Sequence, residues 1–195
     1  MSLATQLSWI PGDEIVAIAT QPQDTLAAHV LDVCRGKSET LACAESLTGG
    51  LLSDSLVRIP GASSSFLGSA VTYSTHIKHT ILGVDSGLLS SVGAVHQEVA
   101  GEMARGVLSV FSSDVALSTT GVAGPTSQDG QEVGTVFIGV AQAGHHPRVA
   151  VYGLVVDSEI IGELHTCSQF TGGRSTLSER EIIRKVAVLA ALSRV

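Results

Sequence analysis

The chain has 195 residues and carries 11 Lys plus Arg against 18 Asp plus Glu, which gives a formal net charge of −7. Hydrophobic residues make up 44% of the chain and charged residues 15%, a composition that supports a packed core and excludes an intrinsically disordered protein. The negative charge argues against broad binding of nucleic acid or of an anionic membrane surface, although one phosphate group can still be bound locally.

The length and the cysteines predict one cytoplasmic domain. Domains usually have about 100 to 200 residues, so residues 1–22 are expected to form a leader and residues 23–195 a single domain. Cys34, Cys43 and Cys167 are odd in number and widely spaced, which predicts free thiols in a reducing compartment. No run approaches the roughly 18 apolar residues of a membrane span, and the first residues lack the basic segment of a signal peptide.

Helices and strands are expected to alternate through the first half of the chain. Apolar residues recur there at spacings of three and four in the helical segments and form short continuous runs in the strands. The predicted elements are a helix that Asp24 caps and that ends near Gly36, a strand at 41–44, a helix that Pro60-Gly61 terminates, a strand at 66–72, a short segment carrying His76, Lys78 and His79, a connection at 84–95, and a helix that begins at His96.

The second half is expected to add three strands and a terminal helix. The predicted elements are a strand at 114–120, a polar loop at 126–132, a strand at 133–141, a hairpin turn at 145–147, a strand at 149–156, an unassigned stretch at 158–173, and a helix beginning near Ser175 or Ser178. Ser178 to Glu181 matches a capping box. Early crossovers followed by a hairpin predict an α/β fold, a three-layer α/β/α sandwich with a mixed, mostly parallel sheet.

The stretch LACAESLTGG at 41–50 is the first candidate for chemistry. Ser46 is placed at a turn between a buried strand and a helix. There the backbone N–H groups of Thr48, Gly49 and Gly50, together with the helix dipole, would stabilise the oxyanion of an attacked carbonyl. The alternative is that Ser46 or Thr48 simply caps the helix.

Lys78 and Tyr73 are the second candidates. Tyr73 follows the strand at 66–72, and the carboxyl ends of strands are where ligands bind in open α/β sheets. A lysine that is desolvated in a cleft can accept the proton of a serine, so Lys78 can activate Ser46, with Tyr73 relaying the proton or holding the lysine. The alternatives are a solvated lysine on a short helix and a half-buried tyrosine at a strand end.

Support for a metal or a phosphate loop is weaker. His76 and His79 share a helical spacing, but no further ligands complete a metal site, so no metal is predicted. The segment 121–124 is either a glycine-rich phosphate cradle or a tight turn after a strand. Asp129-Gly130 is predicted to be a turn without a chemical role.

Several blocks, in the same order, resemble the C-terminal domain family of the competence/damage-inducible protein CinA, whose stand-alone members are nicotinamide mononucleotide deamidases. The resemblance covers roughly residues 24–192. The matching blocks are Ala44–Gly50 with AESCTGG, Pro60–Ser64 with PGAS, Val71–Ser74 and Lys78 with VTYSNEAK, Leu82–Val84, Gly93–Val95, Glu98–Ala100, Thr120–Pro125 with TGIAGP, and Val133–Val136 with VGTV.

This resemblance implies an amidohydrolase that acts on nicotinamide mononucleotide without a metal or cofactor, in pyridine nucleotide salvage, and that forms a homo-oligomer. It implies Ser46 as nucleophile, Lys78 as base and Tyr73 as an assisting hydroxyl. The residues it implies for substrate binding are Glu45, Thr48, Gly49, Gly50, Thr120, Gly121, Ala123, Gly124 and Arg174. The guanidinium of Arg174 would contact the phosphate, and the alternative is a solvated residue before a helix.

The chain departs from the family pattern at a few positions. Leu47 replaces a small polar or thiol residue, Thr75-His76-Ile77 replaces Asn-Glu-Ala beside Lys78, and Gly172-Gly173-Arg174 replaces a Gly-Asp-Arg segment. The change beside Lys78 keeps open a nucleotide-binding regulatory module without turnover. Hydrolysis of a different small amide is a further alternative.

Overall fold

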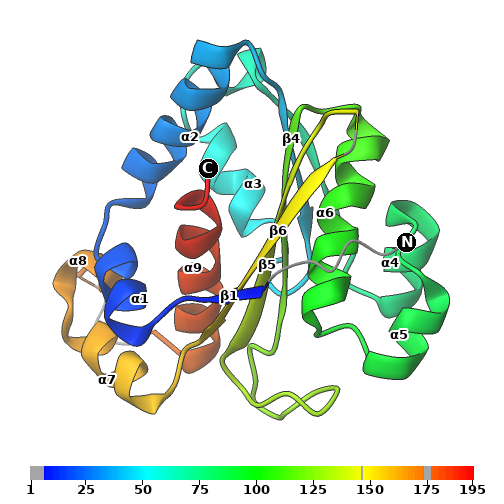
Figure 1. Cartoon of the computed structure of the whole chain (residues 1–195). Helices are drawn as coiled ribbons and strands as arrows, with labels where there is room; N and C mark the ends of the chain where they lie inside the picture. Colours follow the sequence, from blue (N-terminus) through cyan, green and yellow to red (C-terminus); the bar gives the residue numbers. More distant parts are fainter. Residues whose placement is uncertain (1–6, 146, 174–176) are drawn as a thin grey trace.

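The computed structural model describes residues 7–145, 147–173 and 177–195, and these residues form one six-stranded sheet. The strands are β1 (Leu7–Trp9), β2 (Leu41–Glu45), β3 (Phe66–Val71), β4 (Val115–Gly121), β5 (Thr135–Gln142) and β6 (Arg148–Val155). Their order is β1-β6-β5-β4-β2-β3 (Figure 1). Strand β5 runs antiparallel to both of its neighbours, whereas the remaining pairs are parallel, so the prediction of a mixed, mostly parallel sheet is confirmed.

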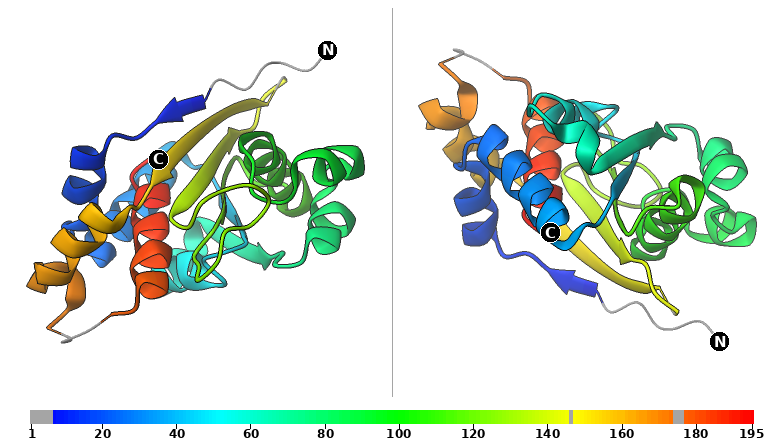
Figure 2. Two further views of the ribbon diagram at one scale, coloured as in Figure 1. Left: turned by 90° about the horizontal axis from the view of Figure 1, so that it is seen from below. Right: turned by 90° about the horizontal axis from the view of Figure 1, so that it is seen from above.

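Helices cover both faces of the sheet, as Figures 1 and 2 show. One layer contains α4 (Thr75–Leu82), α5 (Ser86–Val92) and α6 (Gln97–Phe111). The other contains α1 (Gly12–Ala19), α2 (Gln23–Lys37), α3 (Leu51–Val57), α7 (Ser158–Thr166), α8 (Ser168–Thr171) and α9 (Glu179–Leu192), and a 3-10 turn at Ala62–Ser64 precedes β3. The predicted α/β/α sandwich is therefore confirmed.

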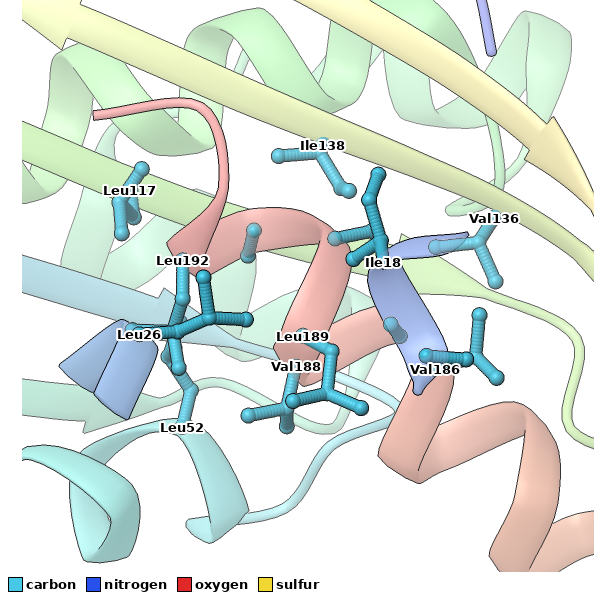
Figure 3. Close-up of a cluster of buried hydrophobic side chains, with 14 of the residues drawn as sticks. Ile18, Leu26, Leu52, Leu117, Val136, Ile138, Val186, Val188, Leu189 and Leu192 are labelled. Atoms are coloured by element: carbon cyan, nitrogen blue, oxygen red, sulfur yellow. The ribbon is translucent and has the colours of Figure 1, made fainter. Parts of the chain in front are cut away.

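The larger core lies between the sheet and the layer that contains α9. Ile182, Val186 and Leu189 of α9 are almost completely buried and belong to one cluster with side chains of the sheet and of α1 to α3. Figure 3 shows Val186 and Leu189 within this cluster. The predicted capping box is present, because Ser178 Oγ accepts the Glu181 N–H and the Glu181 carboxylate accepts the Ser178 N–H at 2.8 Å. Helix α9 thus begins at a defined residue and runs through the centre of its layer.

On the opposite face, α6 packs unusually close to its neighbours through glycines. A Cβ on Gly139 would lie 2.4 Å from the Ala100 carbonyl oxygen, so only glycine allows α6 to rest on β5 at this distance. A Cβ on Gly106 would lie 2.0 Å from the Leu82 carbonyl oxygen at the end of α4. These contacts fix α4, the helix that carries Lys78, against the body of the protein.

The N-terminal segment is part of the folded body from residue 7 onward. Strand β1 pairs in parallel with β6, and α1 packs against α9. Helix α2 begins one residue before the predicted cap: Pro22 is its N-cap, and Asp24 lies in the first turn without a capping hydrogen bond, so that prediction is wrong. Within the described residues, none of the helices combines the length and apolar character needed to cross a bilayer.

Besides α1, which lies in the predicted leader, two stretches without a predicted helix are helical. The predicted connection at 84–95 contains α5, and the unassigned stretch 158–173 contains α7 and α8. In both regions an aspartate caps the helix: Asp85 accepts the Leu88 N–H at 2.7 Å, and Asp157 accepts two N–H groups of α7. The Gly and Ser content of the first stretch concealed this capping signal.

Candidate active site

The carboxylate of Glu45, at the end of β2, organises the turn that follows it. Glu45 has no solvent exposure, and its two oxygens accept six hydrogen bonds, among them those from the N–H groups of Gly50 (2.8 Å), Leu52 (3.1 Å) and Ser53 (2.9 Å) and from the Thr48 hydroxyl (2.8 Å). Glu45 therefore satisfies the first N–H groups of α3, and it is not among the residues that line the pocket described below.

The alternative that the serine or threonine of this turn caps α3 is wrong. The N-cap position is Gly50, and it has no side-chain cap. Thr48 has no solvent exposure, and its hydroxyl lies within hydrogen-bond distance of Glu45 and of Thr119 Oγ1 (2.8 Å each). Ser46 Oγ does not cap the helix and instead lies within hydrogen-bond distance of Lys78.

The backbone of the turn presents two N–H groups for an anion. Gly49 and Gly50 adopt left-handed conformations (φ 57° and 100°), and their N–H groups are occupied: that of Gly49 donates to the Ser46 carbonyl at 3.2 Å, and that of Gly50 to the carboxylate described above. In the described part of the chain, the N–H groups of Leu47 and Thr48 have no protein acceptor. Successive N–H groups in such a turn form an anion-binding concavity. Of the three predicted oxyanion donors, Thr48 therefore remains, and Leu47 is added.

Lys78 lies against the serine hydroxyl, although the two residues are 32 positions apart in sequence. Its Nζ is 3.0 Å from Ser46 Oγ, 2.8 Å from the Thr72 carbonyl oxygen and 3.2 Å from the Tyr73 carbonyl oxygen. Lys78 has no solvent exposure, so the alternative of a solvated lysine is wrong. All three acceptors are uncharged, and no carboxylate forms an ion pair with this ammonium among the described residues.

The surroundings of Lys78 change its protonation. Burial lowers the pKa of Lys78 to about 8, and the opposing effect of the Asp129 carboxylate, which raises it, is smaller. Desolvation disfavours the charged form of a lysine, because the protein interior solvates the ammonium less well than water does. A general base works best when its pKa lies near the operating pH, so Lys78 is suited to accept the Ser46 proton.

A pocket of about 260 Å³ opens in front of Ser46. Its walls come from the turn after β2, the loop after β4 and the start of α9, with Ser46, Leu47, Tyr73, Ala94, Val95, Gly121–Gly124, Thr126–Gln128 and Arg180 as lining residues. Gly121, Ala123 and Gly124 thus line the pocket. Thr120 does not, because its buried hydroxyl donates to the Ala94 carbonyl oxygen at 2.7 Å.

Tyr73 and Arg180 close one side of this pocket. Tyr73 is 63% exposed, so the alternative of a half-buried residue is wrong, and its hydroxyl accepts a hydrogen bond from Arg180 at 3.2 Å. The other Nη of Arg180 donates to the Gly124 carbonyl oxygen at 2.6 Å. Arg174, the predicted phosphate contact, lies outside the described residues.

Sequence reasoning missed Arg180, although it carries a recognisable signal. Arg180 lies in the first turn of α9, where the positive end of the helix dipole disfavours a cation. An arginine at this unfavourable position indicates a role outside the helix itself. Arg180 lines the pocket in front of Ser46, which is consistent with a role in binding a ligand there.

Asp129 holds the loop that borders the pocket. Its carboxylate accepts the N–H groups of Ala94 (2.7 Å) and Val95 (3.3 Å), residues that line the same pocket. Residue 129 itself has a positive φ of 52°, in agreement with the predicted turn. The loop 126–132 is thereby tied to the segment that precedes α6.

The histidines near Lys78 take part in local contacts. His79 Nδ1 is 2.8 Å from the Val84 carbonyl oxygen, and His76 Nε2 is 3.3 Å from Thr80 Oγ1. Over the ranges 7–145, 147–173 and 177–195, no group of three or more His, Cys, Asp or Glu side chains is arranged to hold a metal ion.

Comparison with known proteins identifies relatives that match most of this chain. The family model described as the CinA C-terminal domain matches residues 23–159. A CinA-like protein of Frankia casuarinae is 42% identical over 149 residues (71% of this chain and 34% of the relative), and a putative competence-damage inducible protein of Bacillus subtilis is 46% identical over 122 residues (62% and 29%). This chain thus spans about a third of the length of these relatives.

Solved structures of proteins with similar descriptions share the fold of this chain. The competence/damage inducible protein CihA from Agrobacterium tumefaciens superposes with a TM-score of 0.72 at 26% identity, covering 88% of this chain and 92% of that one. The competence damage-inducible protein A from Klebsiella pneumoniae superposes with a TM-score of 0.71 at 24% identity, covering 89% and 94%, which shows a common fold.

Proposed function

The chain belongs to the CinA C-terminal domain family, and we propose that it is an amidohydrolase that converts nicotinamide mononucleotide and water to nicotinic acid mononucleotide and ammonia. The observation that carries the proposal is the 3.0 Å separation between Ser46 Oγ and the buried Nζ of Lys78, at the wall of a pocket of about 260 Å³. A serine paired with a desolvated amine is an activated nucleophile for acyl transfer.

The first half of the reaction forms an acyl-enzyme. Neutral Lys78 accepts the hydroxyl proton of Ser46 while Oγ attacks the carboxamide carbon. The negative charge that develops on the carbonyl oxygen is stabilised by the N–H groups of Leu47 and Thr48. The C–N bond then breaks, and protonated Lys78 returns its proton to the departing ammonia.

The second half reverses these roles. A water molecule gives its proton to neutral Lys78 as its oxygen attacks the ester carbon, and the same N–H groups stabilise the second oxyanion. The Ser46 oxygen leaves with the proton from Lys78, so the original serine is restored and a carboxylic acid is released. The acid then ionises and gives its remaining proton to ammonia or to solvent water. Each step moves one proton between the lysine and a reacting atom, and no metal is required for the balance.

Recognition of the nucleotide is assigned to the rim of the pocket. Arg180 presents a guanidinium, which matches a phosphate group in geometry and charge, so we assign it a phosphate contact. The predicted phosphate contact of Arg174 stays a prediction. The backbone N–H groups of Ala123 and Gly124 have no acceptor among the described residues and can add hydrogen bonds to the ribose or phosphate. A pocket of this volume suits a small ligand that extends partly into solvent.

The test is the release of ammonia from nicotinamide mononucleotide by the purified protein in the presence of a chelator, followed by mass detection of the acid product. Wild-type protein is expected to turn over, and Ser46→Ala to lose at least about 10³-fold in rate. No release by the wild type, or equal release by Ser46→Ala, would refute the proposal. Tight binding of the nucleotide by calorimetry without product would instead favour a regulatory module, and turnover of another amide would favour a different substrate.

Two further expectations from the sequence stay predictions. A homo-oligomer is expected, and multi-angle light scattering of the purified chain measures its mass directly. A cytoplasmic location is expected, and fractionation of the native host tests it. Neither expectation enters the mechanism above.

A further inference from the structure

Arg184 of α9 holds the nucleophile turn by two of its backbone carbonyl groups. Its Nε donates to the Leu47 carbonyl oxygen and its Nη2 to the Thr48 carbonyl oxygen, both at 2.8 Å. A Cβ placed on Gly49 would lie 3.3 Å from the same Nη2, so the guanidinium lies close against the turn. Two hydrogen bonds from one planar, permanently charged group fix the orientation of their acceptors, not only their position.

The orientation of these carbonyls determines where an N–H group points. Because a trans peptide is planar, its C=O and N–H point in opposite directions. The Leu47 carbonyl faces Arg184, so the Thr48 N–H on the same peptide faces away from Arg184. Arg184 lines a separate cavity of about 440 Å³, between α3, α8 and α9, whereas Leu47 lines the pocket in front of Ser46.

The rest of the turn is held by the opposite charge. The Glu45 carboxylate accepts the N–H groups of Gly50, Leu52 and Ser53. Arg184 takes carbonyl oxygens and Glu45 takes N–H groups, so the turn is fixed at both kinds of backbone group. Within the described residues, the N–H groups of Leu47 and Thr48 have no acceptor, whereas that of Gly49 donates to the Ser46 carbonyl oxygen.

We propose that Arg184 is a positioning residue for catalysis: it sets the Leu47–Thr48 peptide so that its N–H is directed to the oxyanion position before substrate arrives. The inference rests on the proposed function for its reacting group, but not on the identity of the substrate. Arg184 itself touches no substrate, because it does not line the pocket in front of Ser46. Its loss is expected to lower the rate of acyl transfer and to leave ground-state binding unchanged.

The experiment compares Arg184→Ala, Arg184→Lys and the matched control Arg58→Ala. Arg58 lines the same cavity, but it is exposed and pairs with Asp24 at 3.6 Å, so it has no contact with the turn. Arg184→Ala is expected to lose about 10- to 100-fold in kcat with little change in KM, since loss of one oxyanion donor costs about 10²- to 10³-fold. Arg184→Lys should fall between this variant and the wild type, because a lysine is a point donor.

Rescue by a small cation separates positioning from folding. In Arg184→Ala, the truncated side chain borders the cavity of about 440 Å³, through which guanidinium ions can reach the two carbonyls. Guanidinium chloride below denaturing concentrations should restore part of kcat in Arg184→Ala, whereas sodium chloride at equal ionic strength should not. Circular dichroism and thermal melts identify any variant that is unfolded, and in that case the Arg184→Lys kinetics decide the question.

A second measurement keeps this inference distinguishable from the proposed function. A fluorophosphonate probe reacts with an activated serine, and its phosphoryl oxygen takes the place of the oxyanion. If wild type is labelled at Ser46 but does not hydrolyse nicotinamide mononucleotide, the proposed function fails, and labelling rates replace kcat in the comparison. Wild-type kcat or labelling in folded Arg184→Ala, no guanidinium rescue, or no labelling of wild type would overturn the positioning role.

Discussion

Titration of Lys78 should control the rate of the proposed reaction, and the pH profile follows from its pKa of about 8. The catalytic form is the neutral amine, so activity rises with pH. At pH 7 about 9% of the lysine is neutral, and at pH 9 about 90%, so kcat/KM should increase about ten-fold between these values.

The assay is initial ammonia release at sub-saturating nicotinamide mononucleotide and constant ionic strength, with Ser46→Ala as the background. Sub-saturating substrate is used because kcat/KM reports the pKa of the free enzyme. The half-maximal rate should lie near pH 8. A flat profile, or a midpoint near the ordinary lysine value of 10.5, would contradict the assignment of Lys78 as the base.

Asp129→Asn provides an internal control of the electrostatics. The Asp129 carboxylate raises the pKa of Lys78, so its neutralisation should move the midpoint to lower pH and increase the rate at pH 7. The amide oxygen of asparagine can still accept the N–H groups of Ala94 and Val95, which preserves the loop. An unchanged or raised midpoint in this variant would refute the electrostatic argument.

Three further predictions concern stability and substrate binding. The folded protein lowers the pKa of Lys78 from 10.5 to about 8, so the unfolded chain binds more protons than the folded one between these pH values. The unfolding free energy of wild type, measured by urea titration, should therefore rise with pH across this window by up to about 3 kcal/mol relative to that of Lys78→Met. Glu45→Ala leaves buried N–H and O–H donors of the nucleophile turn without an acceptor, so the unfolding free energy should fall by at least about 3 kcal/mol in the same assay. A loss below about 1 kcal/mol would contradict the anchoring role of Glu45. Arg180→Ala should raise KM for nicotinamide mononucleotide about ten-fold or more, and steady-state kinetics with nicotinamide riboside, which lacks the phosphate, should show no such effect.

The sequence was informative about local elements and less so about how distant strands pair. Apolar spacing placed the buried faces of α6 and α9, because burial depends on a pattern within one helix. It did not predict that β1 pairs with β6 at one edge of the sheet, since that pairing joins segments more than 130 residues apart. Helix α5 was missed because its Gly and Ser residues resemble a loop, whereas its stability depends on the Asp85 cap and on packing.

In the candidate site, too, residues in local sequence patterns could be predicted, whereas residues brought in from distant segments could not. Ser46, Tyr73 and Lys78 were proposed from their positions at strand ends and from motif resemblance, and the structure brings the hydroxyl of Ser46 and the amine of Lys78 to 3.0 Å. Arg180 and Arg184 were not proposed, because they come from a helix near the other end of the sequence. Arg180 reaches the pocket, and Arg184 the nucleophile turn, only through tertiary packing. Their i, i+4 spacing places both on one side of α9, a pattern that acquires a meaning only once the neighbours of that side are known.

Because α9 supplies Arg180 and Arg184, the order of synthesis on a ribosome matters for this protein. Strand β2 and Ser46, the residue that follows it, emerge more than 120 residues before the helix that closes the pocket. A nascent chain that lacks α9 therefore has the serine turn without Arg184 and the pocket without Arg180. We expect translation intermediates arrested before α9 to be inert, so that hydrolysis begins only after this helix has docked.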